Sequence, residues 1–232
     1  MILLTTIVQN DILNICSIYH FGGIMARTKE QNEKMRVTRK EKIRNAALLQ
    51  FVKQGLFATR IQDIAAEAGI AQGLLYHYYA SKDEIFVDLI NDALDKTIEA
   101  SYSVRDMEID PGEKIRFALE RLIDTIENSQ TFLDTCRLIT QASNSTAIPQ
   151  EARDLIQEKR NIPYQVIEKI MEAGQKEGTI IAGDPKMLSI FFWTNINGLA
   201  IYYSTNNNRE VKLDYRVLSS MFLIENEREV EK

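Results

Sequence analysis

The stretch TRIQDIAAEAGIAQGLLYHYYASK, residues 59–82, decides the fold of this 232-residue chain. Thr59 and Gln62 have the spacing of a capping box, which predicts a helix that begins near Arg60. Gly69 suits the left-handed residue that stops this helix and turns the chain sharply.

A second short helix is predicted directly after this turn, over residues 72–79. Ser81 and Glu84 form another capping box, which opens a long helix. Two short helices joined by a tight glycine-containing turn are the pattern of a helix-turn-helix, whose second helix enters the major groove of DNA.

The wider segment IRNAALLQFVKQGLFATRIQDIAAEAGIAQGLLYHYYASKDEI, residues 43–85, resembles the DNA-binding domain of TetR/AcrR-type bacterial transcriptional regulators. The matching marks are AA-x-x-x-F-x-x-x-G, DIA, AGI and G-x-L-Y-x-Y-Y-x-SK, at Ala46–Gly55, Asp63–Ala65, Ala68–Ile70 and Gly73–Lys82. The detailed match covers roughly residues 40–90. Ala71 and Leu74 depart from the pattern, because the family often has hydroxyl residues there.

The whole chain is predicted to be all-α, because its apolar residues recur at three- and four-residue spacing. The resemblance implies a three-helix DNA-binding head and a helical body that binds a ligand and dimerises. We therefore expect an N-terminal extension and basic arm over residues 1–39, a head over 40–84 and a regulatory and dimerisation domain over 85–232.

The charge is distributed unevenly along the chain. Residues 26–82 contain 11 Lys+Arg and 5 Asp+Glu, a net charge of +6, whereas residues 83–232 contain 17 and 27, a net charge of −10. Asp11 supplies the remaining negative charge of the overall −5. A basic head on an acidic body is typical of a head that meets phosphate, although a solvated charged surface alone would give the same count.

The residue inventory argues against an enzyme, a metal site or a cofactor. Cys16 and Cys136 lack the spacing of a disulfide framework or a zinc site, and His20 and His77 are the two histidines of the chain. Cys136 is expected to be a small apolar core residue. No pair of catalytic groups can be assigned, and we predict no cofactor.

The first 24 residues differ from the rest of the chain. They are apolar but interrupted by polar residues, and they lack the basic start and cleavage site of a signal peptide. Met25 opens a basic, polar segment, so we expect translation to begin there. The alternative is an extension that lies on a membrane or a partner; our expectation is a cytoplasmic protein without stable membrane association.

Further helices are predicted from periodicity and from their boundary residues. They cover Lys40–Lys53, Ser81–Ser101, a segment from Pro111 to about Ile126, Phe132–Ala142, Gln150–Lys176, Asp184–Ser204 and Leu213–Ile224. Residues 26–39 are predicted to be a mobile basic arm. Pro163 should kink or break the helix that contains it, and Gly178 should end that helix.

Residues on the second short helix divide between packing and DNA. Leu75 and Tyr79 lie four residues apart and suit packing against the neighbouring helices. The predicted DNA contacts are Arg60, Gln72, Gly73, Tyr76, His77 and Lys82. Gln72 suits adenine, whereas Tyr76 and His77 suit phosphate or sugar and Lys82 suits phosphate at a helix start.

The last two predicted helices are apolar enough to pair with their copies in a four-helix bundle, although an intramolecular core would show the same pattern. The candidate interface residues are Phe191, Phe192, Leu199, Tyr202, Leu218 and Phe222. The body is where the family holds an inducer, and the candidate lining residues are Phe132, Cys136, Tyr164, Met171, Trp193 and Asn197. Such residues at helical spacing are also typical of an ordinary core.

The leading hypothesis is a homodimeric repressor that leaves palindromic double-stranded operator DNA when an unknown small hydrophobic inducer binds. One alternative is a membrane-tethered regulator that uses residues 1–24. Another is an all-α ligand-binding protein or enzyme with an incidental helix-turn-helix.

Overall fold

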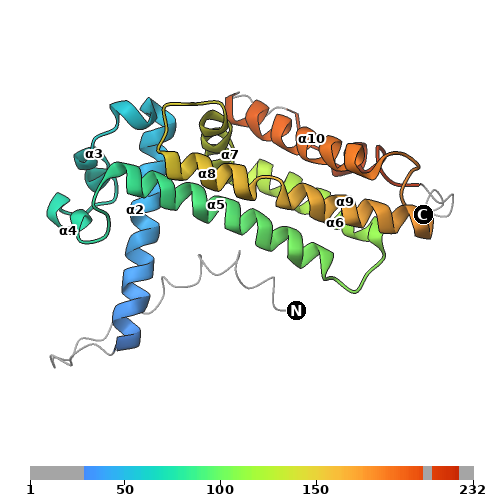
Figure 1. The fold of residues 1–232 in the computed structure, drawn as a ribbon, viewed down its shortest axis with the longest axis horizontal. Coiled ribbons are helices and arrows are strands. Elements are labelled where there is room, and N and C mark those ends of the chain that lie inside the picture. Colours follow the sequence, from blue (N-terminus) through green and yellow to red (C-terminus); the bar gives the residue numbers. More distant parts are fainter. Residues whose placement is uncertain (1–28, 206–210, 225–232) are drawn as a thin grey trace. The chain divides into compact units, whose positions relative to one another are not determined.

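The computed structural model describes residues 29–205 and 211–224, with side chains described from residue 33 onward. The chain divides into two compact units between Thr38 and Arg39. The described helices are α2 (Lys29–Ala58), α3 (Ile61–Glu67), α4 (Gln72–Tyr76), α5 (Lys82–Arg105), α6 (Pro111–Asn128), α7 (Gln130–Ser143), α8 (Gln150–Lys159), α9 (Ile162–Glu177), α10 (Pro185–Thr205) and α11 (Tyr215–Ser219) (Figure 1). Within these residues the pairing of extended backbone is limited to one antiparallel bridge, Ile180 with Leu223. The predicted all-α fold is confirmed.

The first described helix begins earlier than predicted. α2 is helical from Lys29, so the described part of the expected mobile arm belongs to this helix. Gly55 (φ 79°) interrupts α2 where the sequence predicted its end. Ile43, Ala47 and Phe51 are fully buried, as their common face predicted.

Thr59 does not cap α3, which corrects the first predicted capping box. Its side chain is buried, and its hydroxyl donates to the carbonyl oxygen of Gly55 at 2.7 Å. Arg60 is the N-cap residue, and the Asp63 carboxylate accepts from the Arg60 backbone N–H at 3.2 Å. The hydroxyl therefore serves the end of α2 rather than the start of α3.

Two apolar cores organise the second unit. The first core joins α6, α9, α10, the start of α7 and the segment around α11. The second core joins α2, α3, α4 and the first half of α5 with the end of α7 and with α8. The expected boundary between residues 84 and 85 thus runs through the second core, and α5 is not the sole link between head and body among the described helices.

The pattern predicted as one helix over 150–176 is two helices. α8 ends at Lys159, and α9 begins at Ile162 with Pro163 in its first turn. α8 packs along α5 and contributes Ala152 and Ile156 to the second core, whereas α9 packs on α10 and α6 in the first core. The predicted break at Pro163 is confirmed, since α8 and α9 are separate helices (Figure 1). It coincides with the change from one core to the other.

The last predicted helix, 213–224, is mostly not a helix. α11 covers five residues, and the chain beyond it pairs with the segment after α9. The backbone N–H of Ile181 donates to the Phe222 carbonyl at 2.9 Å, and the Ile224 N–H donates to the Thr179 carbonyl at 3.1 Å. The predicted length of the second helix expected in the four-helix bundle is therefore wrong, because α11 covers only Tyr215–Ser219.

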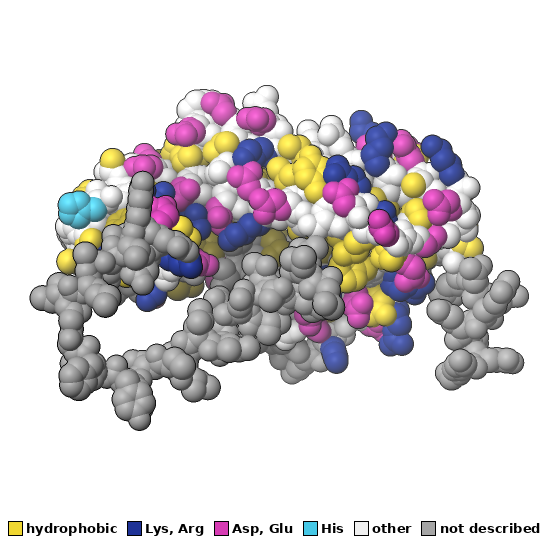
Figure 2. Space-filling view, turned by 90° about the horizontal axis from the view of Figure 1, so that it is seen from below, with side chains coloured by type: hydrophobic (Ala, Val, Ile, Leu, Met, Phe, Trp, Pro, Cys, Tyr) yellow, Lys and Arg dark blue, Asp and Glu magenta, His cyan; other side chains and the backbone are white. Residues whose placement is uncertain are grey.

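No described helix is both long enough and apolar enough to cross a membrane. Residues 1–24 and Met25 lie outside the described residues. On the face that Figure 2 shows, Lys and Arg side chains alternate with Asp and Glu, and hydrophobic side chains form separate patches between them.

Candidate DNA interface and ligand core

The turn between α3 and α4 is formed as predicted. Gly69 has a φ of +65°, in the left-handed region that favours glycine. The Ile70 backbone N–H donates to the Ala65 carbonyl at 3.0 Å, which closes the end of α3. The helix-turn-helix geometry therefore follows from the Ala68–Ile70 segment.

The second short helix has one buried and one exposed side. Leu75 and the following Tyr79 are buried in the second core, as expected. Gln72, Gly73, Tyr76 and His77 are exposed, with 51% of Tyr76 accessible. The exposed set is the set predicted to meet DNA, and its contact with DNA stays a prediction.

α4 is shorter than predicted and starts without a side-chain cap. It ends at Tyr76, and Tyr79 beyond this end packs in the core and hydrogen-bonds with Asp88. Ala71 is its N-cap residue and makes no side-chain cap bond. Leu74 is partly buried, so neither position that departs from the family pattern supplies a hydroxyl to phosphate.

Lys82 is placed differently from the expectation of a free phosphate contact. Its ammonium group donates to the backbone carbonyls of Leu56, Phe57 and Thr59 at 2.7, 2.8 and 3.0 Å. An ammonium has three donors, and all three are used. Lys82 thus fastens the start of α5 to the carbonyl end of α2, whereas Arg60 remains exposed.

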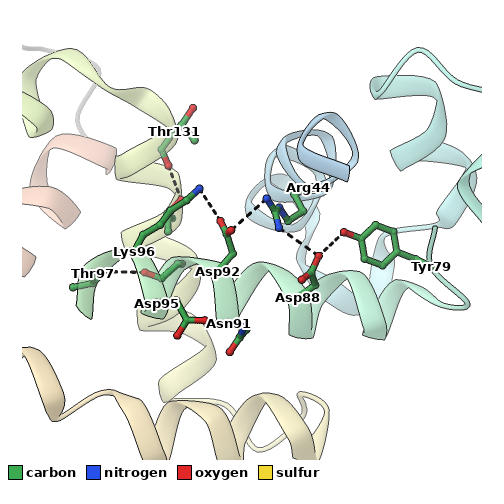
Figure 3. Close-up of polar contacts among 11 residues, drawn as sticks. Arg44, Tyr79, Asp88, Asn91, Asp92, Asp95, Lys96, Thr97 and Thr131 are labelled. Carbon is green, nitrogen blue, oxygen red and sulfur yellow. Dashed lines mark hydrogen bonds and ion pairs between the residues drawn. The ribbon is translucent and has the colours of Figure 1, made fainter. Parts of the chain in front are cut away.

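A chain of charges fixes the head to α5, and no local sequence pattern indicates it (Figure 3). Arg44 of α2 lies between two carboxylates of α5, 3.6 Å from Asp88 and 3.3 Å from Asp92. Lys96 pairs with Asp92 at 2.8 Å. Tyr79 donates to Asp88 from the other side.

Tyr79 stays protonated in this network. Burial raises the pKa of Tyr79 above its usual value, and the hydrogen bond to the Asp88 carboxylate raises this pKa further. Because the phenol keeps its proton, it remains the donor to Asp88. The network thereby holds Tyr79, three residues after the end of α4, against α5.

A second polar link joins α8 to α5. Lys159, at the last residue of α8, donates to Asn91 at 2.7 Å and to Asp95 at 2.5 Å. These residues lie more than 60 positions apart, so periodicity alone could not have paired them.

Five of the six predicted ligand residues meet in the first core. Met171 and Trp193 are buried there, and Phe132, Cys136 and Tyr164 pack against it. Burial raises the pKa of the Cys136 thiol to about 12, so this thiol is uncharged near neutral pH. Asn197 is exposed on α10, which corrects its assignment to the interior.

The predicted dimer residues divide into three groups. Phe191 and Tyr202 are exposed on α10, at 48% and 54%. Leu199 and Leu218 are partly buried against the first core. Phe192 and Phe222 are buried inside the chain's own core with their rings 6.1 Å apart, so they cannot form a surface and their assignment is wrong.

Two hollows open among the described residues. One of about 600 Å³ lies between α2 and α3, with polar residues such as Gln50, Asp63 and Glu67 on its walls. The other, about 450 Å³, lies where the end of α5 meets the start of α9 and includes Tyr102 and Arg105. The predicted ligand residues line neither hollow.

Residues 43–89 match the family model of "Bacterial regulatory proteins, tetR family". The transcriptional repressor KstR2 of Mycolicibacterium smegmatis is 31% identical over 91 residues, which are 39% of this chain and 44% of that protein. KstR2 of Rhodococcus jostii is 26% identical over 141 residues, 61% of this chain and 67% of that protein. The match spans less than half the length of the first of these relatives.

Solved structures share the fold. A TetR-like transcriptional regulator from Rhodococcus sp. RHA1 aligns with a TM-score of 0.60 at 22% identity, over 79% of this chain and 90% of the other. FadR from Bacillus subtilis, in complex with stearoyl-CoA, aligns with a TM-score of 0.58 at 19% identity, over 78% and 94%. These likenesses extend through the helical body.

Proposed function

We propose that this chain, whose residues 43–89 match the family model of tetR bacterial regulatory proteins, is a dimeric transcriptional repressor released from its operator by a small hydrophobic inducer. The observation that carries the proposal is that α4 and the residues after it have two different sides. Leu75 and Tyr79 are buried, whereas residues 72, 73, 76 and 77 are exposed. A second short helix held from behind, with polar and aromatic groups facing out, is what reading of the major groove requires.

The surface of α10 supports the dimer. Its exposed face carries Met187, Ile190, Phe191, Thr194, Gly198 and Tyr202 in a stripe at three- and four-residue spacing. A Cβ on Gly198 would meet nothing within 4 Å inside the chain. A glycine in such a stripe lets a second helix approach closely, so we place the two-fold axis against α10 in place of the bundle first expected.

The proposed route from inducer to DNA runs through both α5 and α8. Both helices belong to the core that holds α3 and α4. A ligand bound in the first core shifts the operator affinity by its differential affinity for the two arrangements of the heads. FadR is a relative in fold whose structure holds stearoyl-CoA, which supports an apolar ligand for this body.

The testing experiment starts with genome-wide footprinting of the purified protein, followed by salt-titrated binding to the recovered operator. Tyr76→Ala is expected to weaken binding to every operator, whereas Gln72→Ala should lose about 1–3 kcal/mol at one base position and relax that preference. Tyr102→Ala and Gln157→Ala, on α5 and α8, are the matched controls. Unchanged affinity in Tyr76→Ala would count against α4 as the reading helix.

Two alternatives make different predictions. A membrane-tethered regulator would sediment with membranes only when residues 1–24 are present. An enzyme would turn over a substrate without DNA and would be insensitive to Tyr76→Ala. We place the protein in the cytoplasm because a repressor must reach the chromosome.

A further inference from the structure

Trp193 carries a buried donor that the protein itself does not use. It is the single tryptophan of the chain, it lies on α10, and 9% of it is exposed. Its indole Nε1–H is fully buried and finds no acceptor among the residues that the structure describes. Indole nitrogen is a donor only, and a buried unpaired donor costs about 1–3 kcal/mol, so a role outside the fold is expected.

The surroundings of this donor are apolar and aromatic. The ring of Tyr164 lies 6.0 Å from the Trp193 ring, and the ring of Phe192 lies 5.4 Å away in an edge-on arrangement. Met171 is buried in the same apolar core, and Phe132 and Cys136 pack against that core. The Cys136 thiol is neutral because burial raises its pKa to about 12, so it adds no charge to this environment.

One residue of this cluster lies next to the junction between α8 and α9. Tyr164 is in the first turn of α9, directly after the residues that separate α9 from α8. Asn161, the N-cap residue, makes no side-chain cap bond there, so this turn lacks the usual restraint of a helix start. Met171 lies further along α9 in the same core. Its side chain is flexible and polarisable and adapts to different shapes. The cluster therefore borders the first turn of α9, which has no side-chain cap.

We propose that the cluster around Trp193 binds a neutral, mainly apolar molecule with one carbonyl-type oxygen, which accepts the hydrogen bond of the Trp193 indole. The inference rests on the proposed function, because it names the class of inducer for the same body. A ketone, ester or thioester satisfies the donor while its hydrocarbon part replaces apolar packing. A carboxylate does not fit, since it would bring an uncompensated charge into the cluster.

The test compares two probes of equal size on two proteins. 2-Decanone and 2-methyldecane have the same number of heavy atoms and differ in the oxygen. Binding to the full chain and to Trp193→Phe is measured by calorimetry, with the emission of the single tryptophan followed in the unsubstituted protein. We expect the ratio of the 2-decanone affinity to the 2-methyldecane affinity to be about tenfold higher in the unsubstituted protein than in Trp193→Phe, because the variant keeps a ring but leaves the buried ketone oxygen without a donor.

A second readout needs no ligand. Trp193→Phe loses buried ring volume but also removes an unsatisfied donor, so in the absence of any probe its thermal midpoint should fall less than that of Phe192→Leu, which loses ring volume in the same core without removing a donor. A larger fall for Trp193→Phe than for Phe192→Leu would show that the indole already has a partner, such as an ordered water, and would overturn the proposal. The same affinity ratio of the two probes in both proteins, or binding by neither probe, overturns it as well.

A third probe and an operator assay separate the possible failures. Tighter binding of decanoate than of 2-decanone would show a site for an anion and would also overturn the neutral class. Operator binding by the ligand-free protein tests the proposed function alone. Probe discrimination without operator binding would support the ligand site and contradict the proposed repressor function. Operator binding without probe discrimination would support the repressor function and contradict the ligand site.

Discussion

Gly73 is the residue at which stability and DNA binding can be separated. A Cβ at this position would meet nothing within 4 Å, and the backbone of Gly73 is not left-handed. Glycine inside a helix costs about 0.5–1 kcal/mol relative to alanine, so Gly73→Ala should raise the free energy of unfolding by that amount. If Gly73 is kept for close approach of DNA, the same change should weaken operator binding at least tenfold.

The matched control is Gly69→Ala, because Gly69 has positive φ. This variant should lose about 1 kcal/mol of stability through backbone strain. Denaturant titrations and operator binding would be measured on both. Full operator affinity in Gly73→Ala would show that the DNA backbone does not come close to this residue.

The main role of Lys82 is to stabilise the fold. Replacing it by methionine removes three hydrogen bonds to the end of α2, and charged hydrogen bonds of this kind are worth about 1.5–3 kcal/mol each before solvent screening. We expect Lys82→Met to lower the free energy of unfolding by about 1–3 kcal/mol, while the salt slope of operator binding remains unchanged. Lys53→Met, at an exposed position on α2, is the control.

The opposite result would restore the sequence-based assignment. A salt slope lowered by about 1, with stability unchanged, would mean that the ammonium leaves its carbonyls to hold a phosphate. The sequence could not distinguish these roles, because a lysine at the start of a helix suits phosphate and the carbonyls of Leu56 and Phe57 come from a segment 25 residues away.

Among the elements, α8 is the one whose attachment can be tested most directly. Lys159 joins its last turn to Asn91 and Asp95 of α5. Lys159→Met should cost about 1 kcal/mol, since the pair is only partly buried, and should speed hydrogen exchange in α8 while leaving α9 unchanged. Lys169→Met, which loses an exposed pair on α9, is the control.

Faster exchange in both helices would contradict the assignment of α8 and α9 to different cores. If α8 carries the signal to the heads, Lys159→Met should also reduce the effect of an inducer on operator affinity without abolishing either binding event.

Helix boundaries were predictable where a local residue decides them. Gly69 and Gly178 both have the left-handed backbone expected of them, and Ser81 caps α5 by accepting from the Glu84 backbone N–H. Asp110 with Pro111 likewise starts α6. At these positions the determining interaction spans three or four residues, so the sequence contains it.

The mispredicted ends depend on partners far away in the chain. α11 is cut short because residues 222–224 pair with the segment after Gly178. α4 ends at Tyr76, and Tyr79 beyond it packs in the core and donates to Asp88. Of the predicted sites, the exposed face of α4 followed from helical spacing, whereas the links of Arg44 and Lys159 to α5 left no local pattern.

For the whole molecule, the α10 stripe predicts the oligomeric state. Phe191→Glu places a charge at the middle of this stripe, and burial of an unpaired charge opposes association. We expect the variant to run as a monomer in light scattering and to lose at least 100-fold in operator affinity, since two half-sites are then no longer read together. Its thermal unfolding should remain cooperative.

Ile109→Glu, on the exposed connection between α5 and α6, is the control for an added surface charge. Val217→Glu asks separately whether α11 takes part in the interface. A dimer that survives Phe191→Glu but not Val217→Glu would move the two-fold axis from α10 to α11.

The second core also determines which fragments of this protein can fold without exposing apolar surface. Its buried residues include Leu138, Ala142, Ala152 and Ile156, which lie far beyond the helix-turn-helix. A fragment that stops after α4 or α5 would expose the apolar surface that these four residues cover. The helix-turn-helix head therefore cannot be transferred to another regulator by itself. A chimera must also include α8 and the end of α7, or the apolar surface that they cover must be redesigned.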